Sequence, residues 1–159
     1  MDFIEVIRNR HAVRRYKKDP VPETKMKTLY EALSLAPSGN NKQPYRFIFV
    51  DDEEIRKQIA EKACHQDFIK DVPLIVVACC EPGRSFDTAI AVDHMVLAAV
   101  SEGLSTCWIG WFERETVKKI LGIPDFMEVP ILVTTGYADE KPQSKPKKSL
   151  EELIGRNRY

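Results

Sequence analysis

The chain has 159 residues, of which 43% are hydrophobic and 30% charged, as is typical of a soluble globular protein. Its 24 Lys and Arg residues balance its 24 Asp and Glu residues, so the overall charge indicates neither a nucleic-acid nor a membrane partner. The N-terminus lacks a signal-peptide pattern, and no apolar run approaches the length of a membrane span. We therefore expect one cytoplasmic domain over residues 1–159.

The cysteines and histidines do not follow the spacing of a metal site, so no metal is predicted. Cys79 and Cys80 are adjacent, and no second close pair of cysteines accompanies them. Together with Cys107 they lie in apolar, strand-like runs, where a free cysteine commonly packs as a small hydrophobic residue. A reducing compartment agrees with this interpretation.

The first predicted helix, Asp2 to Arg10, runs into a basic segment, Arg8 to Lys18. Six of the eleven residues in this segment are Arg or Lys, and none is acidic. Such a charge run is often only a solvated surface. Here apolar residues interrupt the charges, so we expect the segment to pack and to hold Arg10 and Arg14 in fixed directions. A phosphate would be a natural partner for such arginines.

A helix predicted from Pro22 to Ala36 leads into a polar loop, Ala36 to Tyr45. Four side chains between Ser38 and Gln43 are amides or hydroxyls, with Gly39 among them. These groups suit a ligand rich in ring nitrogens and carbonyls. A plain polar turn that ends the helix is the alternative interpretation.

The remaining elements are predicted from apolar periodicity and turn residues. Strands are expected at 45–50, 73–80, 104–112 and 128–137, and helices at 51–63, 86–102, 113–121 and 150–154. Residues 64–70 are ambiguous and could form a short helix. The helix at 86–102 is apolar around most of its circumference, so it must be buried within the domain or against another subunit. Because strands and helices do not alternate regularly, we predict an α+β fold with a sheet flanked by helices.

The tail from Ala138 to Lys148 carries four lysines and two prolines, which stiffen it. The chain thus has three polar or basic clusters, at 10–18, 37–43 and 141–148, and an aromatic-rimmed turn around Gly110. They would suit an anionic, heteroaromatic cofactor that supplies the chemistry while the protein binds it. Dinucleotide-binding, Walker and nucleophile-elbow motifs are missing from the sequence. Cys64 is next to His65, so the sequence alone does not exclude a cysteine nucleophile activated by a histidine.

Three motifs occur in order along the chain. Residues 10–16 read Arg-His-Ala-Val-Arg-Arg-Tyr and precede a Pro-Val-Pro break at 20–22. Residues 36–45 read Ala-Pro-Ser-Gly-Asn-Asn-Lys-Gln-Pro-Tyr, and residues 103–110 read Gly-Leu-Ser-Thr-Cys-Trp-Ile-Gly. This combination resembles the nitroreductase family of FMN-dependent oxidoreductases, and the resemblance covers essentially the whole chain.

The resemblance implies an intertwined homodimer of nitroreductase-like α/β sandwiches, each with a mostly antiparallel sheet, and two FMN sites at the interface. Arg10 and His11 would contact the FMN phosphate, with Lys145 and Lys147 closing on it, and Arg14 would reach the pyrimidine edge of the flavin. The other residues implied to bind FMN are Ala12, the backbone of Ile109, Gly110 and Trp111 near flavin N5, and, from the partner subunit, Pro37, Ser38, Gly39, Asn41 and Gln43.

The sequence departs from the family pattern in three ways. Ala12 stands where the family usually has Ser, which removes a hydroxyl contact. Lysines in the tail replace a more usual arginine, so phosphate recognition loses its bidentate geometry but keeps its charge. The chain is also short, so the segments that usually cover the substrate pocket are reduced and the pocket is expected to be open.

We predict an FMN-dependent NAD(P)H oxidoreductase that works by a ping-pong mechanism. A reduced nicotinamide would deliver hydride to flavin N5 and leave, and a nitroaromatic or quinone would then take its place. No protein acid or base is required, so no catalytic residue is named. The alternatives are a flavin enzyme of the same fold with other chemistry, such as a dehalogenase or dehydrogenase, and a flavin-binding or sensing protein without turnover. A nucleic-acid binder ranks last, because one phosphate explains the basic clusters more simply.

Overall fold

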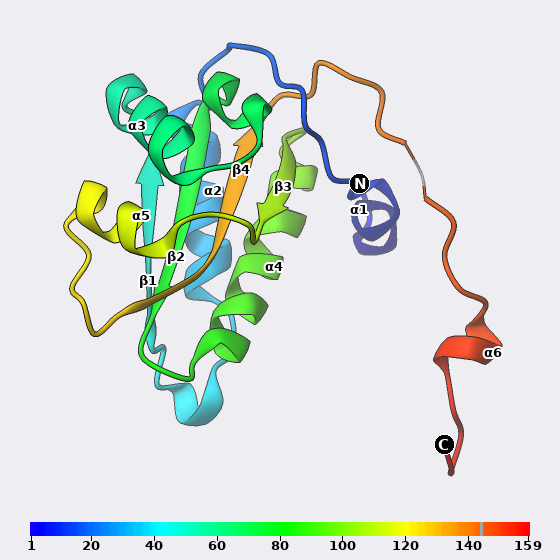
Figure 1. Cartoon of the computed structure of the whole chain (residues 1–159). Helices are drawn as coiled ribbons and strands as arrows, with labels where there is room; N and C mark the ends of the chain where they lie inside the picture. The colour runs from blue at the N-terminus through cyan, green and yellow to red at the C-terminus, as the bar shows by residue number, and fades with distance from the viewer. Residues whose placement is uncertain (144) are drawn as a thin grey trace.

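A four-stranded antiparallel sheet forms the centre of the computed structural model, which describes residues 1–143 and 145–159 (Figure 1). The strands lie in the order β1-β2-β4-β3, and each neighbouring pair is antiparallel. Their bounds are β1 (Tyr45–Val50), β2 (Leu74–Cys80), β3 (Ser105–Ile109) and β4 (Glu128–Gly136). The predicted α+β fold with an antiparallel sheet is confirmed.

Strand β2 is buried along its whole length, as its unbroken apolar sequence predicts. Its side chains alternate between the two faces of the sheet. Ile75 and Val77 belong to the hydrophobic cluster on one face. Leu74 and Val76 belong to the cluster on the opposite face. The sheet therefore carries a core on each side and needs helices over both.

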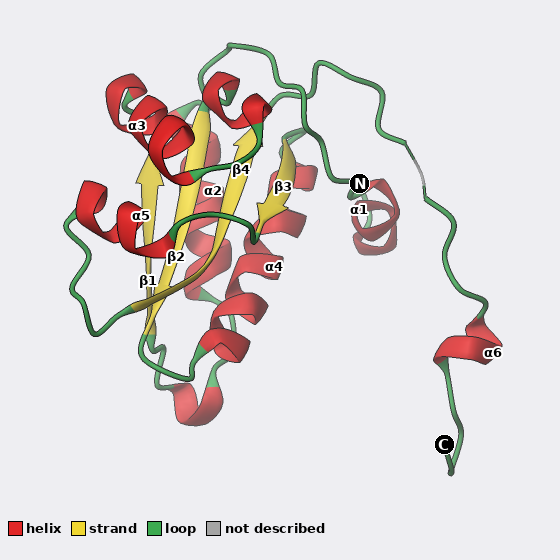
Figure 2. Cartoon of the chain, viewed as in Figure 1, coloured by secondary structure: helices red, strands yellow, loops and turns green. Residues whose placement is uncertain are grey.

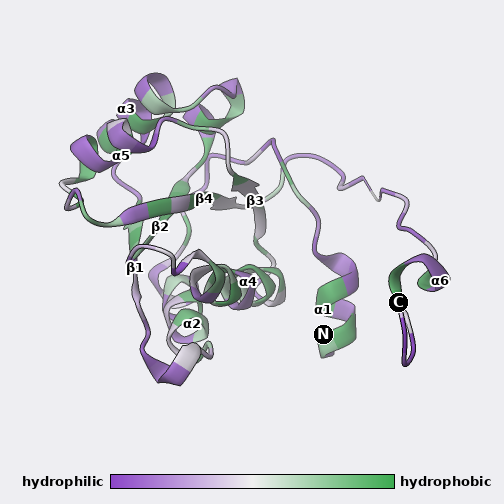
Figure 3. Ribbon diagram, turned by 60° about the horizontal axis from the view of Figure 1, so that its bottom comes forward, coloured by the Kyte–Doolittle hydropathy of each residue, from purple (hydrophilic) through white to green (hydrophobic). Residues whose placement is uncertain are grey.

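Two pairs of helices cover the two faces (Figures 2 and 3). Helices α3 (Glu53–Ala63) and α5 (Arg114–Leu121) pack on one face, where Ile59 and Val117 are fully buried. Helices α2 (Glu23–Ser34) and α4 (Ser85–Ser101) pack on the other, where α4 places Met95 in the core. The apolar character predicted for α4 is thus explained in part by burial within its own chain.

The ends of the elements follow local side-chain chemistry and shift the predicted bounds by one or more residues. Asp2 caps α1 (Phe3–Asn9) in a capping box, and Asp52 caps α3, so each helix begins after the residue expected. The ambiguous residues 64–70 include most of a short 3-10 helix, Asp67–Asp71. The strand expected at 104–112 ends at Ile109, because Phe112 pairs instead with Cys64 in an isolated bridge.

The four cysteines are free thiols, and three of them are buried, which confirms the predicted packing role. Burial raises the pKa of Cys64 and of Cys79 to about 11. A thiol with so high a pKa stays protonated near neutral pH and is a poor nucleophile. The structure therefore argues against the Cys–His nucleophile that the sequence left open at Cys64.

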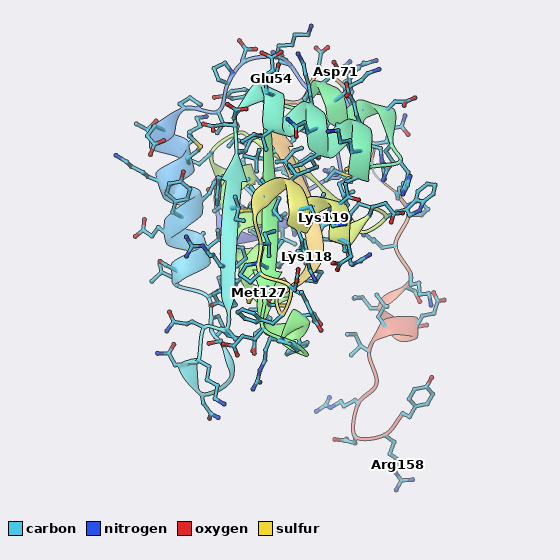
Figure 4. All side chains as sticks on the ribbon, turned by 60° about the vertical axis from the view of Figure 1, so that its left-hand side comes forward. Glu54, Asp71, Lys118, Lys119, Met127 and Arg158 are labelled. Carbon is cyan, nitrogen blue, oxygen red and sulfur yellow. The ribbon has the colours of Figure 1, made fainter. Side chains whose placement is uncertain are left out.

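The C-terminal arm (residues 145–159) extends away from the sheet and its helices (Figures 1 and 4). All of its residues are exposed, including α6 (Leu150–Leu153), and Arg158 lies far from the body of the chain (Figure 4). The predicted lysine tail includes Ser144, which lies outside the described residues. Among the helices described, none is long and apolar enough to cross a membrane.

Candidate functional site

The basic segment and the start of the tail lie side by side and are joined through their backbones. The Lys17 N–H donates to the Tyr137 carbonyl, and the Asp139 N–H donates to the Arg15 carbonyl, both at 2.8 Å. An isolated antiparallel bridge pairs Tyr16 with Ala138. Two segments more than a hundred residues apart in sequence are thereby held next to each other.

Two buried side chains anchor the basic segment, as its apolar residues predicted. Val13 is fully buried, and its N–H donates to the Thr106 carbonyl at 3.1 Å. The hydroxyl groups of Tyr16 and Thr134 are 2.9 Å apart. Burial raises the pKa of Tyr16 well above its usual value, so the phenol stays protonated. With these residues directed inward, Arg14 and Arg15 are left exposed.

A cavity of about 910 Å³ lies between α1, α4 and the tail. Seven of the side chains that line it are basic: Arg8, Arg10, His11, Arg14, Lys141, Lys145 and Lys147. Ala12 also lines it and offers no hydroxyl there. The structure thus brings together the six predicted site residues from the basic segment and the tail.

Much of the rest of the cavity wall is apolar or acidic and was not predicted. Phe3, Ile7 and Leu97 supply the apolar part, and Asp93 and Glu140 the acidic part. The apolar face predicted for the first helix is the signal that could have indicated Phe3 and Ile7. No sequence pattern indicated Leu97, Asp93 or Glu140. They line the cavity because α1 and the tail pack beside α4.

A hydrogen bond to a backbone carbonyl indicates which ring nitrogen of His11 is protonated. Its Nδ1 lies 2.9 Å from the Asn9 carbonyl oxygen, and because a carbonyl only accepts, Nδ1 carries a proton. A bound phosphate oxygen would also require a donor. His11 can therefore bind phosphate through Nε2 only in its doubly protonated, cationic form.

The polar loop from Pro37 to Gln43 adopts a strained backbone. Asn40, Asn41 and Gln43 have φ values of 54°, 54° and 49°, in the left-handed region that non-glycine residues rarely occupy. Inside the loop, the Ser38 hydroxyl accepts a hydrogen bond from the Gln43 N–H at 2.9 Å. The Gln43 amide nitrogen lies 3.2 Å from the side-chain oxygen of Asn41.

The turn after β3 carries an exposed aromatic side chain, Trp111, which contacts a neighbouring histidine ring. Trp111 is 67% exposed, and its ring stacks on that of His65 with centroids 4.8 Å apart. His65 Nε2 lies 3.2 Å from a carboxylate oxygen of Glu113. Ile109 is buried, whereas Gly110 and Trp111 are exposed and can be reached by a ligand.

Within one chain, the three parts of the predicted site do not form a single cavity. Neither the loop at 37–43 nor the turn at 109–111 lines the cavity beside α1, as far as the described residues go. Gln43 instead lines a second pocket of about 560 Å³ with aromatic residues of α2 and β1. The predicted set therefore comes together in one chain only in part.

The main cavity has the size and the chemistry of an anion-binding cofactor site. Its volume falls in the usual range for ligand pockets. Its basic side chains fit a phosphate, and its apolar wall fits the uncharged part of a cofactor. Among the described residues, no three His, Cys, Asp or Glu side chains are grouped to hold a metal ion.

Residues 2–159 match a family model described as "Putative TM nitroreductase". The chain belongs to the nitroreductase family. A relative from Methanothermobacter thermautotrophicus, named "Putative NADH dehydrogenase/NAD(P)H nitroreductase", is 29% identical over an alignment of 156 positions, which covers 91% of this chain and 82% of the relative. The family predicted from the three motifs is therefore confirmed.

Solved structures confirm the nitroreductase fold. The crystal structure of a nitroreductase family protein from Clostridium difficile 630 has a TM-score of 0.89 and 27% identity, with all of both chains covered. The NADPH:FMN oxidoreductase from Vibrio harveyi, complexed with NAD+, has a TM-score of 0.90 over 99% of this chain and 77% of its own. At 24% identity, that second likeness concerns the fold alone.

One relative in this family carries the name of a different activity. The iodotyrosine deiodinase of Thermotoga neapolitana is 25% identical over an alignment of 180 positions, which covers 96% of this chain and 95% of the relative. Different reactions are therefore named among proteins that match nearly the whole of this chain.

Proposed function

We propose that this nitroreductase family member is an FMN-dependent oxidoreductase that uses NAD(P)H to reduce a small acceptor such as a nitroaromatic or a quinone. The names of the curated relatives support this enzyme class and a flavin cofactor. The observation that carries the proposal is the cavity where Arg10, Arg14, Lys145 and Lys147 converge from opposite ends of the chain.

In this proposal the residues of the cavity bind and orient the cofactor. Arg10, Lys145 and Lys147 hold the phosphate, joined by His11 when it is cationic. Arg14 directs its charge toward the pyrimidine edge of the flavin and favours the anionic reduced ring. Bound FMN would supply the hydride chemistry, accepting hydride from NAD(P)H and passing it to the acceptor. No side chain is proposed as a catalytic acid or base.

The site is completed in a homodimer, in which the second subunit supplies Pro37, Ser38, Gly39, Asn41 and Gln43. Support comes from the described wall of the cavity, to which this loop of the same chain does not contribute. Exposed apolar side chains also support a dimer: Phe3 on α1, and Leu150, Leu153 and Ile154 on the C-terminal arm, are at least 58% exposed. The backbone of the turn at 109–111 then lies against the flavin, with Trp111 at the rim.

The test is flavin binding followed by rapid reduction. Purified protein should show the visible absorbance of an oxidised flavin, or gain it when mixed with FMN. Anaerobic mixing with NADH or NADPH should bleach this absorbance rapidly, and an added quinone should restore it. Protein that neither carries nor takes up flavin would refute the proposal. Protein that binds FMN but is not reduced would indicate a flavin-binding or sensing role.

A reductive dehalogenase is the second candidate, because a deiodinase is among the relatives that match nearly the whole chain. Comparing acceptors in steady state separates the two. Release of halide from a halogenated phenol, with no turnover of quinones or nitroaromatics, would favour the dehalogenase. Nucleic-acid binding is disfavoured because many of the basic side chains line one cavity rather than an open surface.

A further inference from the structure

The polar loop holds more backbone strain than an ordinary turn. Asn40, Asn41 and Gln43 all have positive φ within four positions, a backbone conformation that non-glycine residues adopt at an energetic cost. Surrounding contacts must maintain a conformation of this kind. The contact that we identify below joins residues far apart in sequence, so the sequence alone does not show it.

One contact joins the loop to a distant helix. The Gly39 N–H donates a hydrogen bond to Asp87 Oδ1 at 3.0 Å, across 48 residues of sequence. Gly39 lies immediately before the strained residues. Other hydrogen bonds of Ser38 to Gln43 that the structure records, such as that between Ser38 and the Gln43 N–H, stay within the loop region.

Asp87 is well placed to act as a fixed acceptor. It lies in the first turn of α4, where the positive end of the helix dipole favours a carboxylate. Its side chain is half-buried beside the loop, within 4.0 Å of the space a side chain at Gly39 would enter. Met95 of the same helix is fully buried, so the helix that carries Asp87 is packed into the core.

We propose that Asp87 is a positioning residue for the flavin loop, holding Gly39 so that Asn41 and Gln43 keep the strained conformation that binds FMN. This inference rests on the proposed function of the loop. Asp87 itself does not touch the cofactor. The proposed role requires a side-chain oxygen that accepts the hydrogen bond. Asn at position 87 should therefore retain the function, and Ala should lose it.

The test compares Asp87→Ala, Asp87→Asn and a matched control, Glu81→Ala. Glu81 is an exposed acid close to the same end of α4, and its substitution removes the same charge. Hydrogen–deuterium exchange of residues 38–43, measured without FMN, reports the loop alone. Exchange should be about fivefold faster in Asp87→Ala, and unchanged in Asp87→Asn and in the control.

FMN titration then reports the consequence for binding. The dissociation constant should rise about tenfold in Asp87→Ala and stay near wild type in the other two. At saturating FMN, Asp87→Ala should keep its kcat. Unchanged exchange and affinity in Asp87→Ala would overturn the inference, and so would an equal loss in Asp87→Asn. If the wild type binds no FMN, the proposed function fails, and the exchange experiment still decides the role of Asp87 in the loop.

Discussion

A carboxylate oxygen of Glu140 accepts a hydrogen bond from the backbone N–H of Arg14 at 2.6 Å, across 126 residues of sequence. The same oxygen accepts from the Arg15 N–H at 3.2 Å. Glu140 thus joins the tail to the basic segment at the wall of the main cavity. These two hydrogen bonds explain why Glu140 lies in a cavity lined mainly by basic side chains: its carboxylate accepts from two backbone N–H groups.

Replacing Glu140 by Ala should lower the free energy of unfolding by about 1 kcal/mol, since two donors lose a charged acceptor at a half-exposed position. Glu140→Gln keeps an oxygen acceptor and should lose less than half of that. Glu151→Ala, an exposed change on α6, is the control and should have almost no effect. Urea unfolding measures all three. A loss in Glu140→Ala no larger than in the control would show that this contact does not stabilise the fold.

Arg10 is predicted to recognise the phosphate of FMN and not its ring. Arg10→Ala should therefore weaken FMN binding by about tenfold and leave riboflavin binding unchanged, because riboflavin lacks the phosphate. Titration by flavin fluorescence measures both. Lys27→Ala removes an exposed cation from α2 that does not line the cavity, and it serves as the control. Equal losses for FMN and riboflavin would place Arg10 outside the phosphate site.

Asn41 combines a predicted cofactor contact with a positive φ of 54°. Asn41→Ala should weaken FMN binding and also destabilise the protein by about 1 kcal/mol, because alanine tolerates this backbone conformation poorly. Asn41→Gly removes the same amide but relieves the strain, so it should weaken FMN binding while keeping stability. Thermal unfolding and FMN titration of the pair separate the two effects. Full FMN affinity in both variants would remove Asn41 from the site.

Tyr16 should make the stability depend on pH in the alkaline range. Burial raises its folded-state pKa above the ordinary value of 10.0, so its stabilising contribution is complete below pH 10. Above that pH the unfolded chain loses the proton while the folded chain keeps it, and stability falls as pH rises. Between pH 8.5 and 10.5 this loss is about 0.8 kcal/mol. In Tyr16→Phe, urea unfolding should show a fall in the free energy of unfolding over this pH range that is smaller by this amount. The same fall in Tyr16→Phe as in the wild type would contradict the role given to Tyr16.

The sequence predicted which segments form the strands and α-helices, but it placed some of their ends incorrectly. The unbroken apolar run at 74–80 requires burial on both faces, and it forms β2. Asp52 shows how a side-chain hydrogen bond sets a boundary, since its carboxylate caps α3 and the helix begins at Glu53, two residues after the predicted start at 51. Residues 64–70 were ambiguous because a 3-10 turn has no clear apolar period of its own.

For the candidate site too, some features follow from the sequence and others only from the tertiary structure. The sequence by itself determined which residue types could bind a flavin phosphate, because Arg10, Arg14 and the tail lysines lie in recognisable motifs. Only the tertiary structure decided that these cations surround one cavity, since backbone pairing between distant segments brings them together. The same holds for Asp87 at Gly39 and Glu140 at Arg14. Each is a single hydrogen bond between residues far apart in sequence, and such bonds leave no local pattern in the chain.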